Sequence, residues 1–369
     1  MRKNRVATRG GLINLNAGLN DKYGADLLYE WKSNKISTTF GGNFSRRFSP
    51  ADDFERNITS TDQITSTVLS EGESARGRVG YGVRGAIAYE PTPTRYFALN
   101  VRAGDRGGEF ESETDYTETT DPGDALDYRS ISNTDRSGMY YSVSLDAEQR
   151  FSGKHHKLSA SLQFSERDGD EETLNELRDV NGLATEGQRS TEFGPGSRQT
   201  ARLDYELPVG SANKIQAGYR FDRNAAIDNT ELYELNTANG IYEIQPDFTN
   251  LTDYERSIQA GYAIFGGEWK KFGYQAGIRG EYTDRVILFG QTGDTPFAVD
   301  RTDFFPSFHT SYQFPSGQQM MASYSRRIER PRGWWLEPFI TFTDAFNVRS
   351  GNPDLLPEYI DSYELGFQT

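Results

Sequence analysis

The chain has 369 residues and a net charge of −14, and its mean hydropathy of −0.73 is typical of a water-soluble protein. The acidic charge argues against nucleic acid as a partner, since phosphate binding needs clustered Lys and Arg. The absence of cysteine excludes disulfides, thiolate metal sites and cysteine nucleophiles. Aromatic residues nevertheless make up 13 % of the chain, and 37 positions are glycine. Strands favour aromatic side chains and glycine suits tight turns, so the composition favours an all-β chain.

The N-terminal segment 1–5 is basic, but no apolar segment of 7–15 residues follows it. It therefore does not have the form of a signal peptide, and we expect none within this chain. No stretch approaches the 18 or more apolar residues of a membrane-spanning helix. If the chain crosses a membrane, it must do so with strands.

Apolar side chains recur at every second position, from residue 13 to the end of the chain. Successive strand side chains point to opposite faces, so this period predicts about fourteen strands, each with one apolar and one small or charged face. The clearest apolar sets in chain order are Ile13/Leu15/Ala17/Leu19, Leu27/Tyr29/Trp31, Ile36/Thr38/Phe40, Val79/Tyr81/Val83/Ile87/Tyr89, Tyr141/Val143/Leu145/Ala147, Leu158/Ala160/Leu162/Phe164, Ala201/Leu203/Tyr205/Leu207, Ile215/Ala217/Tyr219/Phe221, Ile258/Ala260/Tyr262/Ile264 and Phe272/Tyr274/Ala276/Ile278.

The connections between these strands alternate in length. Short links at 33–35, 91–94, 152–154, 210–213, 270–271 and 315–317 have the chemistry of hairpin turns. Long links lie between them, at about 49–75, 105–136, 168–197, 228–252, 289–301 and 331–357. This alternation predicts an antiparallel transmembrane β-barrel with short periplasmic turns and long extracellular loops, in the outer membrane of a Gram-negative bacterium. The apolar faces then contact lipid, and the opposite faces line a lumen. We expect the lumen to include Arg84, Arg102, Arg202, Arg220, Arg279 and Glu281.

The predicted long loops are acidic. The segment 105–136 has ten Asp or Glu against three Arg, and 168–172 adds a further acidic run. A cation site or a charge-selective mouth is one interpretation, and a solvated loop is the other. The run lacks the spacing of a calcium-binding loop, so we predict no metal site.

The last quarter of the chain carries a specific motif. Segment 324–331 reads Tyr-Ser-Arg-Arg-Ile-Glu-Arg-Pro, and a Gly-Asn-Pro run at 351–353 leads through Pro357 into a final strand. In its order and spacing this part, 304–369, resembles the barrel of TonB-dependent receptors, in particular their outer-membrane β-barrel family. The motif residues, which we interpret as structural, are Arg326, Arg327, Pro331, Gly351, Asn352, Pro353, Leu355, Pro357, Glu358, Glu364 and Gly366.

The resemblance implies import of a scarce solute, such as a siderophore, vitamin, oligosaccharide or peptide. It implies TonB and an internal plug domain as partners, besides outer-membrane lipid, and a barrel of twenty-two strands. Neither a plug domain nor a TonB box is recognisable here, because strand-like alternation begins by about residue 11. We therefore predict that 1–369 is one partial barrel domain, with about fourteen of those strands.

Two other functions remain open. The chain could form a passive porin without a plug, or be a non-functional fragment of a receptor. A hydrolase would need a histidine base, and the only histidines are His155, His156 and His309. We expect no enzyme activity and no cofactor. Trp334 and Trp335, before the Gly-Asn-Pro run, are candidates for stacking on a ligand, although packing against neighbouring loops is the favoured explanation. The solute itself is not predicted.

Overall fold

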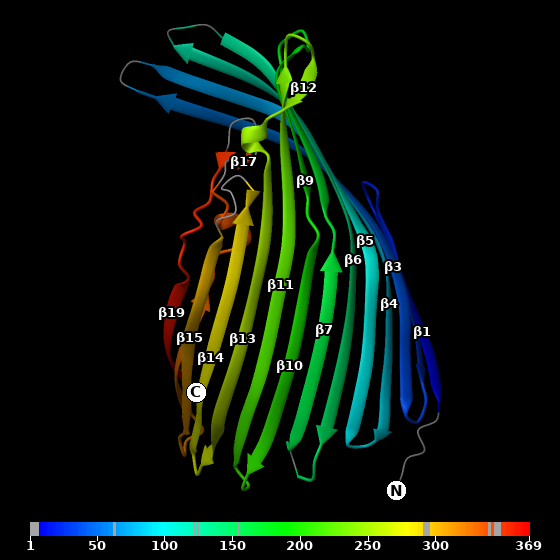
Figure 1. Cartoon of the computed structure of the whole chain (residues 1–369), viewed down its shortest axis with the longest axis vertical. Helices are drawn as coiled ribbons and strands as arrows, with labels where there is room; N and C mark the ends of the chain where they lie inside the picture. The colour runs from blue at the N-terminus through cyan, green and yellow to red at the C-terminus, as the bar shows by residue number, and fades with distance from the viewer. Residues whose placement is uncertain are drawn as a thin grey trace.

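The computed structural model describes residues 7–61, 64–121, 123, 125–153, 155–290, 296–338, 341–342 and 348–369. A 17-stranded antiparallel sheet forms one curved wall, and a two-stranded ribbon lies near one end of it (Figure 1). The strands of the wall are β1 (Thr8–Gly18), β2 (Lys22–Lys32), β3 (Ile36–Ser60), β4 (Thr65–Thr92), β5 (Arg95–Asp121), β6 (Ala125–Arg150), β7 (Lys157–Arg167), β8 (Asp170–Arg178), β9 (Ala184–Phe193), β10 (Gly196–Val209), β11 (Asn213–Asn236), β12 (Ile241–Ile244), β13 (Asn250–Trp269), β14 (Phe272–Phe289), β15 (Phe297–Gln313), β16 (Gln319–Glu329) and β19 (Glu358–Gln368). The ribbon is β17 (Thr341–Phe342) with β18 (Val348–Arg349), and the 3₁₀ turns are η1 (Pro246–Phe248) and η3 (Gly333–Trp335). In the described part of the chain, no helix is long and apolar enough to span a membrane.

The wall follows the order of the sequence. Each strand pairs with the next, and β7 and β8 are two halves of one pass, because both pair with β6. The same holds for β9 and β10 against β11, while β12 is a short return strand at the end of β11. The seventeen strands thus make fourteen passes, as the sequence predicted. Among the described strands, β1 pairs with β2 alone and β19 with β16 alone.

The short links are tight turns at one end of the wall. Gly210 and Gly317 there have φ angles of 67° and 95°, a left-handed conformation that glycine adopts without a steric penalty. This explains why these two hairpins carry glycine between β10 and β11 and between β15 and β16.

The predicted long loops differ from the expectation, because much of them is strand. β3 and β4 stay paired out to Ser60 and Thr65, and β5 and β6 out to Thr119 and Ala125. These hairpins lean over at the end of the wall opposite the short turns (Figure 1). A pair of strands in water satisfies its own backbone hydrogen bonds and tolerates polar side chains on both faces. The polar sequence of these segments therefore did not imply an irregular loop.

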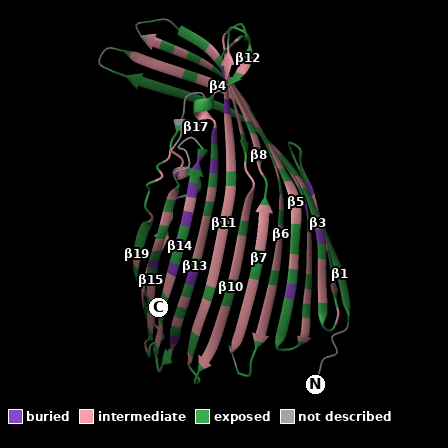
Figure 2. Cartoon of the chain, viewed as in Figure 1, coloured by how far each residue is buried: buried purple, intermediate pink, exposed green. Residues whose placement is uncertain are grey.

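The outer face is a continuous apolar surface. Apolar residues stand opposite each other across successive strand pairs, as in Val101 with Val143 and Leu145 with Leu162. Leu145 and Leu162 are 51 % and 55 % exposed. Buried positions instead gather on the other face of β13 and β14 (Figure 2). A face of exposed, mutually paired apolar side chains is what contact with lipid requires.

Tyrosines mark the end of this apolar surface that lies away from the short turns. Each donates its hydroxyl to the first polar side chain beyond the surface. The pairs are Tyr219 to Gln259 at 3.2 Å, Tyr282 to Asp300 at 2.9 Å, Tyr324 to Asp361 at 2.9 Å and Tyr141 to Glu166 at 2.5 Å. Amphipathic rings in this position are typical of the boundary between hydrocarbon and water.

One predicted apolar set was wrong in its facing. Ala260 and Tyr262 stand opposite Glu281 and Arg279 in the register of β13 and β14, so the set from Ile258 to Ile264 lies on the inner face. Ala260 is 1 % exposed. The outer face of β13 is formed instead by residues such as Gly261, Ala263 and Phe265. Alternation in the sequence separates the two faces of a strand, but it does not show which face points outward.

Candidate functional site

The inner face of the wall is polar, and much of its charge is paired. The structure places the six predicted lumen residues on this inner face, on the side of the strands opposite the lipid-facing apolar residues. Four of the arginines form ion pairs, namely Arg84 with Asp26 at 2.8 Å, Arg202 with Asp204 at 2.5 Å, Arg220 with Asp222 at 2.5 Å and Arg279 with Glu281 at 2.6 Å. Arg102 is exposed and has no ion pair among the described residues. Charged rows of this kind suit a water-filled lumen.

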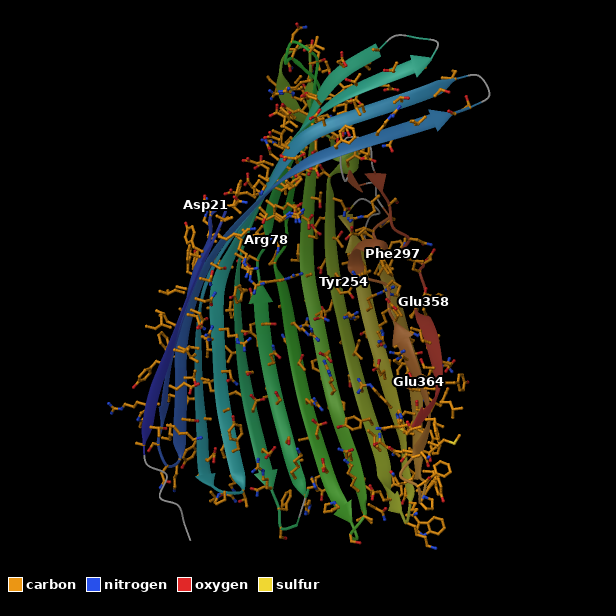
Figure 3. All side chains as sticks on the ribbon, turned by 180° about the vertical axis from the view of Figure 1, so that it is seen from behind. Asp21, Arg78, Tyr254, Phe297, Glu358 and Glu364 are labelled. Carbon is orange, nitrogen blue, oxygen red and sulfur yellow. The ribbon has the colours of Figure 1, made fainter. Side chains whose placement is uncertain are left out.

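A cavity of about 1220 Å³ occupies the inner face near the end away from the short turns. Its lining comes from strands far apart in the wall, including Arg78 of β4 and Tyr254 of β13, both labelled in Figure 3, and from the segment after β16. Strands that are far apart can share a cavity only on a concave surface. The inner face is therefore the lumen side.

The segment that follows β16 folds into this lumen. Leu336 is fully buried and packs with Ile287 and Phe289, whose exposures are 1 %. Tyr254 and Phe297 pack against the same cluster. A second anchor joins Arg330 to Glu281 at 2.6 Å, with the side chains 18 % and 10 % exposed. An apolar cluster and an ion pair thus hold the segment against the wall.

The Gly-Asn-Pro run forms the other arm of this inward loop. The N–H of Gly351 donates to the carbonyl of Glu337 at 2.6 Å, and that of Asn352 donates to the carbonyl of Trp335 at 2.8 Å. A Cβ on Gly351 would lie 2.5 Å from the Trp335 carbonyl oxygen, so only glycine fits. The side chain of Asn352 accepts the N–H of Asp354 at 2.9 Å, which closes the turn into Pro357.

The other motif residues lie around the last two strands. Arg326 stacks over the ring of Tyr359 at 4.8 Å, and Arg327 donates to Ser362 at 3.2 Å. Glu364 and Gly366 stand opposite Ser323 and Met321 across the β16–β19 pair. The remaining ones are the buried Pro331, then Pro353, Leu355 and Pro357 in the loop and Glu358 at the start of β19.

The two candidate stacking residues belong to the inward loop. Trp335 is half-buried and lies under the guanidinium of Arg332 at 5.7 Å. The side chain of Trp334 lies outside the described residues. Of the histidines, His156 bonds Tyr205 at 2.9 Å near a short turn, and His309 lies on the lumen face opposite Ser323.

Four carboxylates lie close together where the inward loop approaches β9 and β11, beyond the apolar surface. Desolvation in the crowded lumen and the charges of Asp228, Glu171 and Glu337 raise the pKa of Glu192 to about 7, although its side chain still reaches solvent. Burial likewise raises the pKa of Asp228 and of Glu337, and Arg349 offsets part of both shifts. Near neutral pH, Glu192 therefore keeps part of a proton that an isolated carboxyl would have released.

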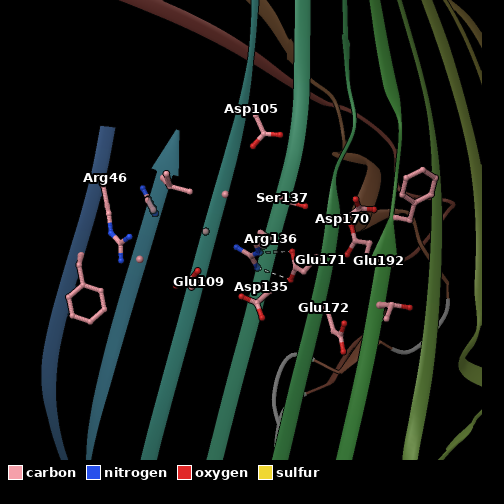
Figure 4. A pocket seen from close by; sticks show the side chains of 18 residues that line it. Arg46, Asp105, Glu109, Asp135, Arg136, Ser137, Asp170, Glu171, Glu172 and Glu192 are labelled. Atoms are coloured by element: carbon pink, nitrogen blue, oxygen red, sulfur yellow. Dashed lines mark hydrogen bonds and ion pairs between the residues drawn. The ribbon is translucent and has the colours of Figure 1, made fainter. Parts of the chain in front are cut away.

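The acidic segments come together around one hollow of the wall. A hollow of about 710 Å³ where the sheet bends is lined by Asp105, Glu109, Asp135, Asp170 and Glu172, with Arg46 at its edge (Figure 4). Arg136 and Glu171 also line this hollow, and they form an ion pair at 2.6 Å. Among the described residues, no group of acidic and histidine side chains could hold a metal ion.

Sequence reasoning missed two arginines in the upper lumen, Arg256 and Arg285. They stand directly opposite each other across the β13–β14 pair, and Arg285 is 8 % exposed. Their sequence signal is weak, because each follows an acidic residue that points to the other face.

The chain has weak similarity to several solved structures. Solved structures with some similarity include the translocator domain of the autotransporter NalP from Neisseria meningitidis, with 11 % identity over 80 % of this chain and 83 % of that chain and a TM-score of 0.26. The toluene transporter TodX from Pseudomonas putida has 8 % identity, coverages of 88 % and 83 % and a TM-score of 0.28. The ferric yersiniabactin uptake receptor FyuA from Yersinia pestis has 8 % identity, coverages of 99 % and 73 % and a TM-score of 0.27. These TM-scores are too low to support an inference about this chain, and no curated protein matches it.

A protein-family model gives the decisive match. The model of the outer membrane protein β-barrel family matches residues 149–369, which is more than half of the chain. That range begins at the end of β6 and includes the inward loop and the Gly-Asn-Pro run. The chain belongs to the outer membrane protein β-barrel family and is an integral protein of the Gram-negative outer membrane.

Proposed function

We propose that this chain is the barrel portion of a TonB-dependent receptor that binds a scarce solute at the cell surface and imports it. The observation that carries the proposal is the inward loop after β16, which Leu336 and Arg330 anchor over the cavity. A loop held in the lumen narrows a diffusion path and adds walls to a pocket. Both properties suit a receptor that binds its solute before transport better than a wide passive pore.

The motif residues of segment 324–367 support the same proposal. They resemble TonB-dependent receptor barrels, and several build the inward loop: Gly351 and Asn352 pair its two arms, and Pro331 is buried beside it. The proposal includes no catalytic step and no cofactor. TonB and a plug domain are the partners it requires.

Genetic epistasis in the host tests the proposal. Uptake of labelled siderophores, vitamin B12, oligosaccharides and peptides is compared in wild type, a strain without this gene, a strain without TonB and the double mutant. We expect one solute whose uptake falls to the same level in all three mutants. Uptake that needs this gene but persists without TonB would contradict the proposal and favour a porin.

A further inference from the structure

Positive charge exceeds negative charge on one part of the lumen wall. On the inner face of β13 to β15, above the short turns, and at Arg330 the charged side chains are Arg256, Arg279, Arg285, Arg301, Arg330, Glu281 and Asp303. Glu281 accepts both Arg279 and Arg330 at 2.6 Å, and Asp303 accepts Arg301 at 3.1 Å. Among the described residues, no carboxylate pairs with Arg256 or Arg285. In a chain with a net charge of −14, this local excess is unexpected.

The two unpaired arginines are also neighbours on the inner face. Arg256 and Arg285 are register partners, and like charges directly opposite in an antiparallel pair are destabilising. The Nε atom of each is buried without a hydrogen-bond partner in the described structure. A charged donor that is buried without a partner destabilises the protein, so an anion that accepts hydrogen bonds from both arginines would be bound favourably.

The surroundings indicate which side an anion would enter from and what its body would contact. Arg256 lines the cavity together with Tyr254, Ile287 and Phe289, which belong to or pack on the Leu336 cluster. The residues next to the arginines on the outer face are Glu255 and Asp284, so the pair lies at the extracellular boundary of the apolar surface. A solute from outside meets the arginines beside an apolar wall.

We propose that Arg256 and Arg285 bind a small organic oxyanion, a carboxylate or phosphate whose apolar body rests against Tyr254 and Ile287. The planar guanidinium group donates two parallel hydrogen bonds to such an oxyanion, and two opposed guanidinium groups clamp it from both sides. As the identity of the imported solute, this inference rests on the proposed function. As a binding site, it stands on the geometry alone.

Titration calorimetry on the purified chain in detergent at low ionic strength tests the site. The probes are citrate and inorganic phosphate, and glucose is the neutral comparison. We expect at least one anion to bind, and binding to weaken at least about tenfold in the double variant Arg256→Gln/Arg285→Gln, since each lost charged hydrogen bond contributes about that factor. The matched control is Arg102→Gln, which changes an unpaired lumen arginine in the same cross-strand row. We expect this variant to bind the anion as tightly as wild type does.

A conservative variant separates the site from folding. Arg256→Lys/Arg285→Lys keeps both charges but loses the planar donors, so we expect intermediate affinity with an unchanged β-sheet circular dichroism spectrum. Selective binding of citrate or of phosphate would tell which oxyanion the site takes. Binding of neither probe, or equal binding by wild type and the glutamine variant, would overturn the proposal.

The same variants distinguish this inference from the import proposal. Anion binding by the purified chain requires no TonB, whereas the epistasis experiment requires no knowledge of the site. Anion binding with TonB-independent uptake would keep the site and reject the receptor. TonB-dependent uptake that is unchanged by the glutamine variant would keep the receptor and reject the site as its solute contact.

Discussion

At the scale of single residues, the upper lumen depends on a few side chains that come from distant parts of the chain. Leu336 joins a loop to β14, and Arg330 brings a second cation to Glu281. Each contact is local, but together they decide whether the inward loop stays in the lumen.

Leu336→Ala should release that loop. Removing a fully buried leucine costs about 2–5 kcal/mol, and here the cost falls on docking of the loop and not on the wall. We expect faster proteolysis between residues 330 and 357 with unchanged heat-modifiable migration on a gel. Leu356→Ala, in the same loop and 76 % exposed, is the control and should be cleaved at the wild-type rate. Equal cleavage of both variants would mean that the leucine does not anchor the loop.

The carboxylate cluster makes the loop sensitive to pH. Glu192 has a folded-state pKa of about 7, above its value of 4.5 in an unfolded chain. A carboxyl with a raised pKa contributes its stability at low pH, and that contribution is lost as pH rises from about 4.5 through 7. We therefore expect the 330–357 loop to be cleaved faster at pH 8 than at pH 6.

Glu192→Gln should flatten this pH dependence, because a neutral amide cannot acquire the repelling charge. Glu186→Gln, an exposed site on the same strand, should keep the wild-type profile. Proteolysis rates across pH, corrected for the protease with a denatured substrate, provide the measurement. A glutamine variant with an unaltered profile would place the titrating group elsewhere.

At the scale of elements, each strand contacts lipid on one face and the aqueous lumen on the other. The same charged substitution at two neighbouring residues should therefore change the free energy of unfolding by different amounts. Leu162 on β7 faces lipid opposite Leu145 and Ala201, whereas Gln163 faces the lumen opposite Ser144 and Thr200. A cation on the lipid face loses hydration that the lumen would supply.

Leu162→Arg should therefore lower the free energy of unfolding in phospholipid vesicles by about 2–4 kcal/mol, and Gln163→Arg should leave it nearly unchanged. Guanidinium titration followed by tryptophan fluorescence measures both variants. Equal losses, or a larger loss for Gln163→Arg, would reverse the facing of this strand.

At the scale of the whole molecule, the difference between the two ends of the wall determines its orientation in the membrane. Short turns lie at one end and the long hairpins at the other (Figure 1), and the long ones face outward in outer-membrane barrels. The chain has no native cysteine, so single cysteines can report on each end.

In intact cells, Ser60→Cys at the tip of the β3–β4 hairpin should react with a membrane-impermeant maleimide. Ser316→Cys, in the short turn after β15, should react only after the outer membrane is permeabilised. Both residues are exposed, so accessibility to the reagent and not burial decides the result. The opposite labelling pattern would invert the molecule.

Much of the architecture could be predicted from the sequence, because alternation and turn chemistry are local. The fourteen passes, the hairpins with Gly210 and Gly317 and the lipid face around Leu145 follow from residues within one or two strands. The polar hairpins such as β3–β4 were mistaken for loops, since polarity reports exposure to water and not the absence of a ladder. The facing of Ala260 and Tyr262 was also mistaken, because both faces of β13 carry apolar residues.

The sequence by itself determined an all-β chain of amphipathic strands and the family motif at its end. Only the tertiary structure decided which face of β13 looks inward, that the segment around Leu336 folds into the lumen, and that Arg256 meets Arg285. The physical reason is the distance along the chain over which each feature is determined. The two-residue period is visible in neighbouring positions of the sequence. Curvature and register instead bring together side chains that are far apart in the sequence, and no local pattern marks such pairs.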